Sequence, residues 1–126
     1  MNNKEIGTDF EKYMCEHLAS LGYWVHFISP DKRGSQPFDI IAVKNNIPLA
    51  VECKTLSKNV KVFSIDRLQE NQKTAFQKWI KCGNEEPLIF ILHGDEIRVV
   101  EWSRLEQEEK VNVKELELWH IVASAE

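Results

Sequence analysis

Hydrophobic residues recur at helical spacing in two parts of the chain. In residues 3–21 they lie on one face and Gly22 follows, which predicts a helix that ends there. This apolar stripe consists of Ile6, Phe10, Met14, Leu18 and Leu21. A second helix is predicted from Asp66, as its N-cap, to about Cys82, because Gly83 provides a typical helix end.

Shorter apolar runs predict strands. Residues 23–28 form one, residues 39–54 form a hairpin that turns at Asn45-Asn46, and residues 87–92 and 97–102 form two more. The resulting order, α-β-β-β-α-β-β, predicts an α/β fold in which helices flank a central mixed β-sheet. We expect a single domain over residues 1–126. Its core covers about residues 3–102, and an acidic C-terminal extension, residues 103–126, adds a short helix and one more short element.

The hairpin brings two acidic residues together. A tight turn centred on Asn45-Asn46 pairs Val43 with Pro48 and Ile41 with Ala50. The same register places Asp39 opposite Glu52, and Lys54 follows on the face that carries Glu52 because side chains alternate along a strand. Like charges directly opposite each other destabilise a sheet. The pair therefore needs an explanation.

A divalent cation would remove the repulsion between Asp39 and Glu52. Strand ends often carry charge only for solvation, but the residues that flank these two acids are apolar, which favours a buried site. Mg²⁺ is usually held by one or two carboxylates together with water and phosphate oxygens. We therefore expect Asp39 and Glu52 to bind Mg²⁺, with Mn²⁺ able to replace it.

Each of the two helices offers one further polar residue. Glu11 lies at the border of the first apolar stripe and can point toward the acids, or it can be a solvated flank. Gln72 falls within the apolar face of the second helix, which carries Leu68, Ala75, Phe76 and Trp79. A buried amide needs partners. It either makes a structural hydrogen bond to a loop or reaches the carboxylates.

Basic residues are concentrated in the middle of the chain. The net charge is −4, but residues 31–81 carry ten bases against five acids. Such a basic segment is typical of phosphate contacts, although solvated helices can also produce it. The loop before Asp39 brings cations, a glycine and a hydroxyl to the acids, unless it is a plain connector. The expected DNA-binding residues are Lys32, Arg33, Gly34, Ser35, Lys58, Lys61 and Lys73.

These motifs resemble those of the PD-(D/E)xK nuclease superfamily. The sequence "PFD", residues 37–39, is followed by "ECK", residues 52–54, in the spacing of the superfamily signature. "GTDFEKYMCEHLASLGYWV" resembles its opening helix with the acid of Holliday junction resolvases. "QENQKTAFQKW" is similar to the glutamine-bearing helix of archaeal-type and RecU-type resolvases.

The resemblance implies that the α/β fold has a restriction-endonuclease-like core. It also implies a metal-dependent DNA endonuclease that acts in DNA recombination and repair. It implies Mg²⁺ on Asp39, Glu52 and the Cys53 carbonyl, Lys54 at the nucleophilic water, Glu11 as an accessory acid and possible ligand, and Gln72 in support. Hydrolysis of a phosphodiester needs a metal and a group that orients water. A serine or cysteine hydrolase is a poor alternative, because no Ser or Cys has a nucleophile-elbow context.

We expect a cytoplasmic homodimer that cuts branched DNA, because two active sites are needed to cut a junction symmetrically. The alternatives are a nuclease or nickase for another form of DNA, and a catalytically silent module that binds nucleic acid or protein. No apolar run is long enough to cross a membrane, so no membrane partner is expected. The three cysteines, Cys15, Cys53 and Cys82, are expected to be reduced core thiols.

Overall fold

The computed structural model describes residues 3–30 and 36–122. Its helices are α1 (Asn3–Ser20), α2 (Glu70–Lys81) and α3 (Trp102–Glu108), with two 3₁₀ turns, η1 (Ile65–Arg67) and η2 (Val113–Glu115). Its strands are β1 (Trp24–Phe27), β2 (Ile40–Lys44), β3 (Ile47–Leu56), β4 (Val62–Ser64), β5 (Leu88–His93), β6 (Glu96–Glu101), β7 (Lys110–Asn112) and β8 (Glu117–Ile121).

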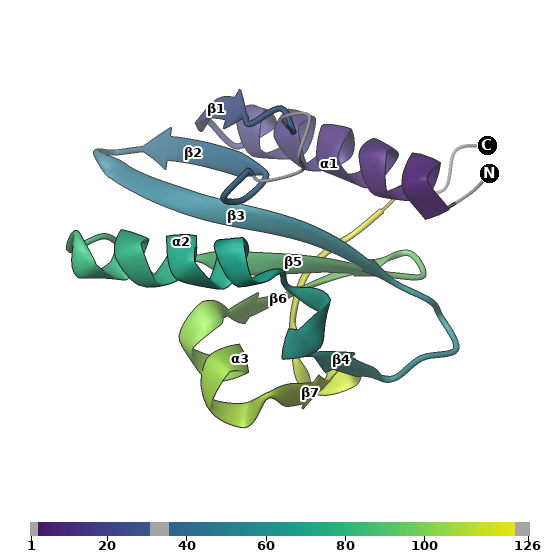
Figure 1. Cartoon of the computed structure of the whole chain (residues 1–126). Coiled ribbons are helices and arrows are strands. Elements are labelled where there is room, and N and C mark those ends of the chain that lie inside the picture. Colours follow the sequence, from purple (N-terminus) through teal and green to yellow (C-terminus); the bar gives the residue numbers. More distant parts are fainter. Residues whose placement is uncertain (1–2, 31–35, 123–126) are drawn as a thin grey trace.

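Six of the strands form one mixed sheet in the order β1-β2-β3-β5-β6-β8, which confirms the predicted fold class. Only β3 and β5 run parallel, and every other neighbouring pair in this sheet is antiparallel. The crossover from β3 to β5 contains α2. Figure 1 shows β3 as the longest strand of the sheet, running between α1 and α2 and continuing past the start of β2.

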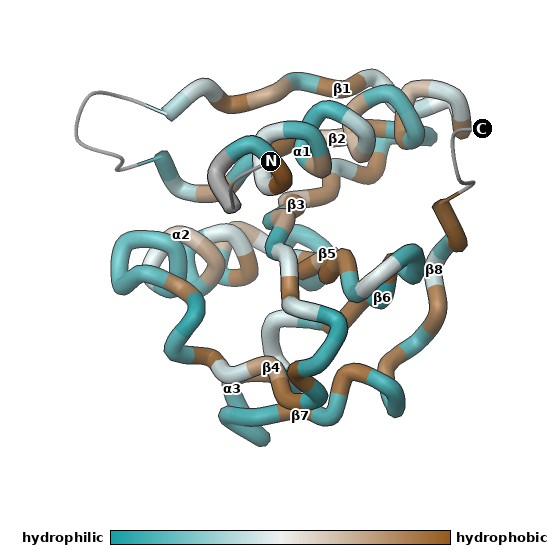
Figure 2. The backbone as a smooth tube through the Cα atoms, turned by 90° about the vertical axis from the view of Figure 1, so that its right-hand side faces the viewer, coloured by the Kyte–Doolittle hydropathy of each residue, from teal (hydrophilic) through white to brown (hydrophobic). Residues whose placement is uncertain are grey.

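Helices cover both faces of this sheet. Figure 2 looks nearly along the axes of α1 and α2, and β3 lies between them. The α1 face buries Phe10, Met14, Leu18, Ile40, Ala42, Val51, Cys53, Phe90, Ile97 and Val99. The face covered by α2 and α3 buries Phe38, Ala50, Leu56, Phe76, Ile89, Ile91, Val100, Trp102 and Leu105, among others. Alternate residues of β3 therefore enter two different cores, as the period of two along a strand requires.

The β2–β3 hairpin has the predicted register. Val43 pairs with Pro48 and Ile41 with Ala50. Asn45 and Asn46 both have positive φ, 53° and 66°, as a two-residue type I′ turn requires. Asparagine tolerates this conformation better than other residues with side chains. The turn sequence thus sets the position of both acids at the far end of the hairpin.

Three expectations need correction. Asp66 is not the N-cap of α2, because it belongs to η1, whose N-cap is Ser64, and the extended backbone of Leu68 separates η1 from α2. Cys82, the C-cap residue of α2, is exposed rather than buried. All three cysteines are free, as expected for reduced thiols. The core also extends past residue 102. The side chains of Leu105, Val111, Val113 and Leu116 are buried in it, and β8 pairs with β6.

The turn gives a direct test of the hairpin. Asn46→Ala should lower the free energy of unfolding by about 1 kcal/mol, because alanine adopts a positive φ only at that cost. Asn46→Gly should leave the free energy of unfolding unchanged or raise it, since glycine prefers this position. Urea denaturation measures both variants. Equal losses in the two would contradict the turn type.

Candidate active site

The candidate site lies where β2 and β3 part. Their pairing begins at Ile40 and Val51, and β3 continues to Leu56 with β5 alongside it on the other edge. Asp39 directly precedes β2. Its backbone N–H donates to the carbonyl of Val51 at 3.1 Å, and its carbonyl accepts from the N–H of Ile28 at 2.8 Å. The backbone of Asp39 is therefore held by the strands on both sides.

The two acids at this point are almost completely buried, with only 4% of Asp39 and 2% of Glu52 exposed. The backbone N–H of Cys53 donates to Oδ2 of Asp39 at 2.8 Å. Burial, together with the nearby Asp39, raises the pKa of Glu52 to about 8, against the lowering effects of Lys54 and Gln72. Burial also raises the pKa of Asp39, while the Cys53 N–H and Lys54 act in the opposite direction.

One oxygen of Glu52 is held by two donors. Lys54 Nζ lies 3.2 Å from Oε2 of Glu52, and Nε2 of Gln72 donates to the same oxygen at 2.8 Å. The orientation of the Gln72 amide is fixed, because its Oε1 accepts from the backbone N–H of Gln69 at 3.0 Å. The structure thus places Gln72 at the carboxylates. The other oxygen of Glu52, Oε1, is buried and has no hydrogen-bond partner among the described residues.

Glu11 approaches the same site from α1. Its side chain is half-buried, and burial raises its pKa to about 7, helped by Asp39 and opposed by Lys54. Glu11 is therefore within electrostatic reach of the two acids. Even so, no three His, Cys, Asp or Glu side chains within residues 3–30 and 36–122 are grouped closely enough to hold a metal ion. The side-chain oxygens that converge are those of Asp39 and Glu52.

This donor set fits a hard divalent cation. Two carboxylates are a common protein contribution to Mg²⁺ sites, which keep water and substrate oxygens as their other ligands. A buried carboxylate oxygen without a partner, such as Oε1 of Glu52, gains from a cation that replaces the missing donor. The N–H and C=O of a strand residue point to the same side. The carbonyl of Cys53 therefore faces the edge at which its N–H meets Asp39.

The predicted DNA contacts are distributed unevenly. Lys32, Arg33, Gly34 and Ser35 lie outside the described residues. Lys58 and Lys61 are exposed in the segment that follows β3. Lys73 lies on α2, where its ammonium is 3.1 Å from the carboxylate of Glu70. All seven residues stay predictions as DNA contacts.

Two polar contacts around the site were not foreseen from the sequence. Asn71 Nδ2 donates to the carbonyl of Gln36 at 3.0 Å and so connects α2 to the segment before Asp39. Arg67 donates to the carbonyl of Thr55 at 2.8 Å on β3. No sequence pattern indicates these long-range bonds. By contrast, the three-residue spacing of Gln69 and Gln72 is that of a capping box, and it could have placed the start of α2.

Comparison with known proteins identifies the family of this chain. The family model described as "Archaeal holliday junction resolvase (hjc)" matches residues 2–121. The chain belongs to this family of archaeal Holliday junction resolvases. It is therefore a Holliday junction resolvase-like nuclease, an endonuclease that depends on a divalent metal.

A solved structure shows the same fold. It is that of Archaeoglobus fulgidus Hjc, a Holliday junction resolvase from an archaeal hyperthermophile, at 21% sequence identity and a TM-score of 0.65. The match covers 86% of this chain and 89% of that one. No curated protein matches the chain. No helix within the described residues is long and apolar enough to span a membrane.

Burial of Glu52 in this resolvase-like site predicts how stability depends on pH when metal is removed. In the folded protein the pKa of Glu52 is about 8, above its ordinary value of 4.5. A group whose folded pKa is raised contributes stability below its unfolded pKa, and this contribution is lost as the pH rises through the folded pKa. In EDTA, the melting temperature of the wild type should therefore fall between about pH 5 and pH 8.5 relative to that of Glu52→Gln.

Glu52→Gln is a matched variant because glutamine keeps the shape of glutamate and does not titrate. Thermal melting of both proteins across this pH range measures the effect. If the melting temperatures of the two proteins change equally with pH, ionisation of Glu52 does not destabilise the fold.

Proposed function

We propose that this resolvase-like nuclease uses Mg²⁺, held by Asp39, Glu52 and the carbonyl of Cys53, to cut four-way DNA junctions. The observation that carries the proposal is the buried pair of carboxylates, in which Oε1 of Glu52 has no hydrogen-bond partner among the described residues. Mn²⁺, which favours the same oxygen ligands, is expected to replace Mg²⁺.

A divalent cation at this site would polarise the scissile phosphate and lower the pKa of a water molecule. The protein residues have distinct roles beside it. Lys54 is placed by its ion pair with Glu52, 3.2 Å away, and its side chain is 19% exposed, so its ammonium can meet both a water molecule and the phosphate. We assign to Lys54 the orientation of the attacking water.

Gln72 and Glu11 support this arrangement. Gln72 positions Glu52, since its amide nitrogen donates to Oε2 and its amide oxygen is held by the N–H of Gln69. Glu11 faces the site from the opposite helix, and we assign to it an accessory role, either as a metal ligand through water or as a proton acceptor. Such outer contacts typically change metal affinity or activity by about 10- to 100-fold.

The substrate requires more than one active site. In the part of the chain that the structure describes, the buried acids are the single pair Asp39 and Glu52, whereas symmetrical resolution of a four-way junction needs two cuts. We therefore infer that the active form is a homodimer, with one site for each cut. An enzyme that acts on branched DNA works in the compartment that holds this DNA, which we infer to be the cytoplasm.

A cleavage assay tests the substrate and the metal together. The protein should cut a four-way junction in Mg²⁺ at paired positions in opposing strands, and it should leave a linear duplex, a single strand and a flap of the same sequences largely intact. Paired cuts within one binding event also report the dimer. Equal cleavage of all four substrates would contradict the junction preference, and cleavage in EDTA would contradict the metal.

Lys54→Ala tests the assignment of the water-orienting group. Junction cleavage under single-turnover conditions should fall at least about 100-fold, the usual contribution of such a group, while junction affinity changes little. Lys44→Ala is the matched control, since Lys44 lies at the other end of β2 and donates to the carbonyl of Leu21. Retained cleavage in Lys54→Ala would remove this lysine from the mechanism.

A further inference from the structure

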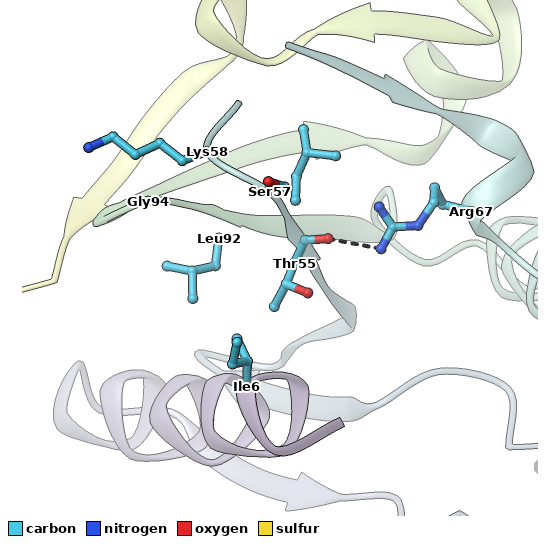
Figure 3. Close-up of a pocket in the computed structure, with 8 residues that line it drawn as sticks. Ile6, Thr55, Ser57, Lys58, Arg67, Leu92 and Gly94 are labelled. Carbon is cyan, nitrogen blue, oxygen red and sulfur yellow. Dashed lines mark hydrogen bonds between the residues drawn. The ribbon is translucent and has the colours of Figure 1, made fainter. Parts of the chain in front are cut away.

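A pocket of about 520 Å³ opens at the end of β3, directly beyond Lys54. Figure 3 shows residues from four parts of the chain around it. The pocket is lined by Ile6 of α1, by Thr55, Leu56, Ser57 and Lys58 at the end of β3, by Arg67 of η1, and by Leu92 and Gly94 near the β5–β6 turn.

Arg67 is exposed but held in place. Its Nη2 donates to the carbonyl of Thr55 at 2.8 Å, the bond drawn in Figure 3, and its guanidinium carbon lies 5.5 Å from the ring centroid of Phe63. A guanidinium has five N–H donors in a rigid fork that matches phosphate oxygens. The bond to Thr55 uses one side of the fork and leaves donors for an anion.

The position of Arg67 is set by the backbone of β3. Thr55 lies two residues after Cys53, so its carbonyl points to the same open edge as that of Cys53. Two strand residues advance about 6.6 Å. Along α1, Ile6 precedes Glu11 by five residues, an advance of about 7.5 Å. Both elements place the pocket one short step from the carboxylates, a step comparable with the spacing of neighbouring phosphates on one DNA strand.

The lining has the chemistry of a phosphate and sugar site. Arg67 and Lys58 supply positive charge, and Thr55 and Ser57 supply hydroxyl groups. Ile6 and Leu92 add an apolar surface on which a deoxyribose can pack. None of the described residues that line the pocket is acidic. A backbone phosphate would therefore meet donors and cations there without repulsion.

The segment after β3, which contains Lys58, is also held in place by hydrogen bonds. His93 Nε2 lies 2.8 Å from the carbonyl oxygen of Val60, and the N–H of Val60 donates to the carbonyl of Ser57 at 2.9 Å. The aliphatic stem of Lys58 lies over Gly94, about 3.7 Å from the position of an added Cβ. The pocket is therefore preformed, which reduces the entropic cost of ordering it on binding.

We propose that this pocket binds the backbone phosphate adjacent to the scissile one, with Arg67 as its principal ligand. The inference rests on the proposed function, because it takes the scissile phosphate to lie at Asp39 and Glu52. Arg67 is on this account a positioning residue. It fixes the register of the cleaved strand on the enzyme and does not touch the reacting atoms.

The first test is the salt dependence of junction binding, measured with Ca²⁺ in place of Mg²⁺. Arg67→Met removes the charged guanidinium that lies over Phe63 and keeps much of the aliphatic stem. Its slope of log affinity against log salt should be shallower than that of the wild type by about 0.9, the value for one phosphate contact. Arg67→Lys should keep the slope, because lysine also contacts phosphate.

Arg104→Met is the matched control. Arg104 lies on α3 and pairs with Glu108 at 2.6 Å, away from the pocket lining. This variant should keep the slope of the wild type. If Arg67→Met also keeps that slope, or if Arg104→Met loses as much as Arg67→Met, the pocket does not bind a phosphate.

The second test locates the phosphate. Each of the two phosphates that flank the cleaved bond is replaced singly by a neutral methylphosphonate. At one of these positions the replacement should weaken binding by the wild type but add no further loss in Arg67→Met. Additive losses at both positions would overturn the proposal. If the wild type fails to cut the junction, that result contradicts the proposed function, and the salt slopes of the first test still decide whether the pocket binds a phosphate.

Discussion

The burial of two carboxylates at one point of the sheet is the constraint on which the rest of the site depends. Asp39 and Glu52 are each at least 96% buried, and burial raises the pKa of both. Such a pair is unfavourable unless donors and a cation compensate it. The surrounding contacts supply the donors. They are the N–H of Cys53, the ammonium of Lys54 and the amide of Gln72.

The fold brings these groups together from both faces of one strand. β3 contributes Glu52 and Lys54, α1 contributes Glu11 on one side, and α2 contributes Gln72 on the other. This arrangement requires β2 to begin no earlier than Ile40. If β2 began earlier and stayed paired with β3, the edge at Cys53 and Thr55 would be occupied, and neither Asp39 nor Arg67 could reach it. In our proposal, the parting of β2 and β3 therefore creates both the catalytic edge and the adjacent phosphate pocket.

Local patterns in the sequence predicted much of this architecture. The Asn45-Asn46 turn defined the hairpin register, and the period of two placed Lys54 beside Glu52. The apolar face of α2 correctly indicated a buried Gln72. Each of these inferences depends on residues close in the chain, where turn geometry and periodicity determine the outcome.

What could not be foreseen depends on contacts between distant segments. Arg67 reaches Thr55 because η1 lies against the end of β3, and Asn71 reaches Gln36 because α2 lies beside the segment before β2. The start of α2 was misplaced because Asp66, a good capping residue, lies within η1, and the extended backbone of Leu68 separates η1 from α2. Tertiary packing overrides local propensity at such positions.

Direct measurement of metal binding tests the central claim that Asp39 and Glu52 form the cation site. Isothermal titration calorimetry with Mn²⁺ should show binding to the wild type and at least about a tenfold loss of affinity in Asp39→Asn, which removes one ligand charge at constant shape. Glu70→Gln, at an exposed carboxylate on α2, should bind Mn²⁺ as the wild type does. Equal affinity in the wild type and Asp39→Asn would contradict the account.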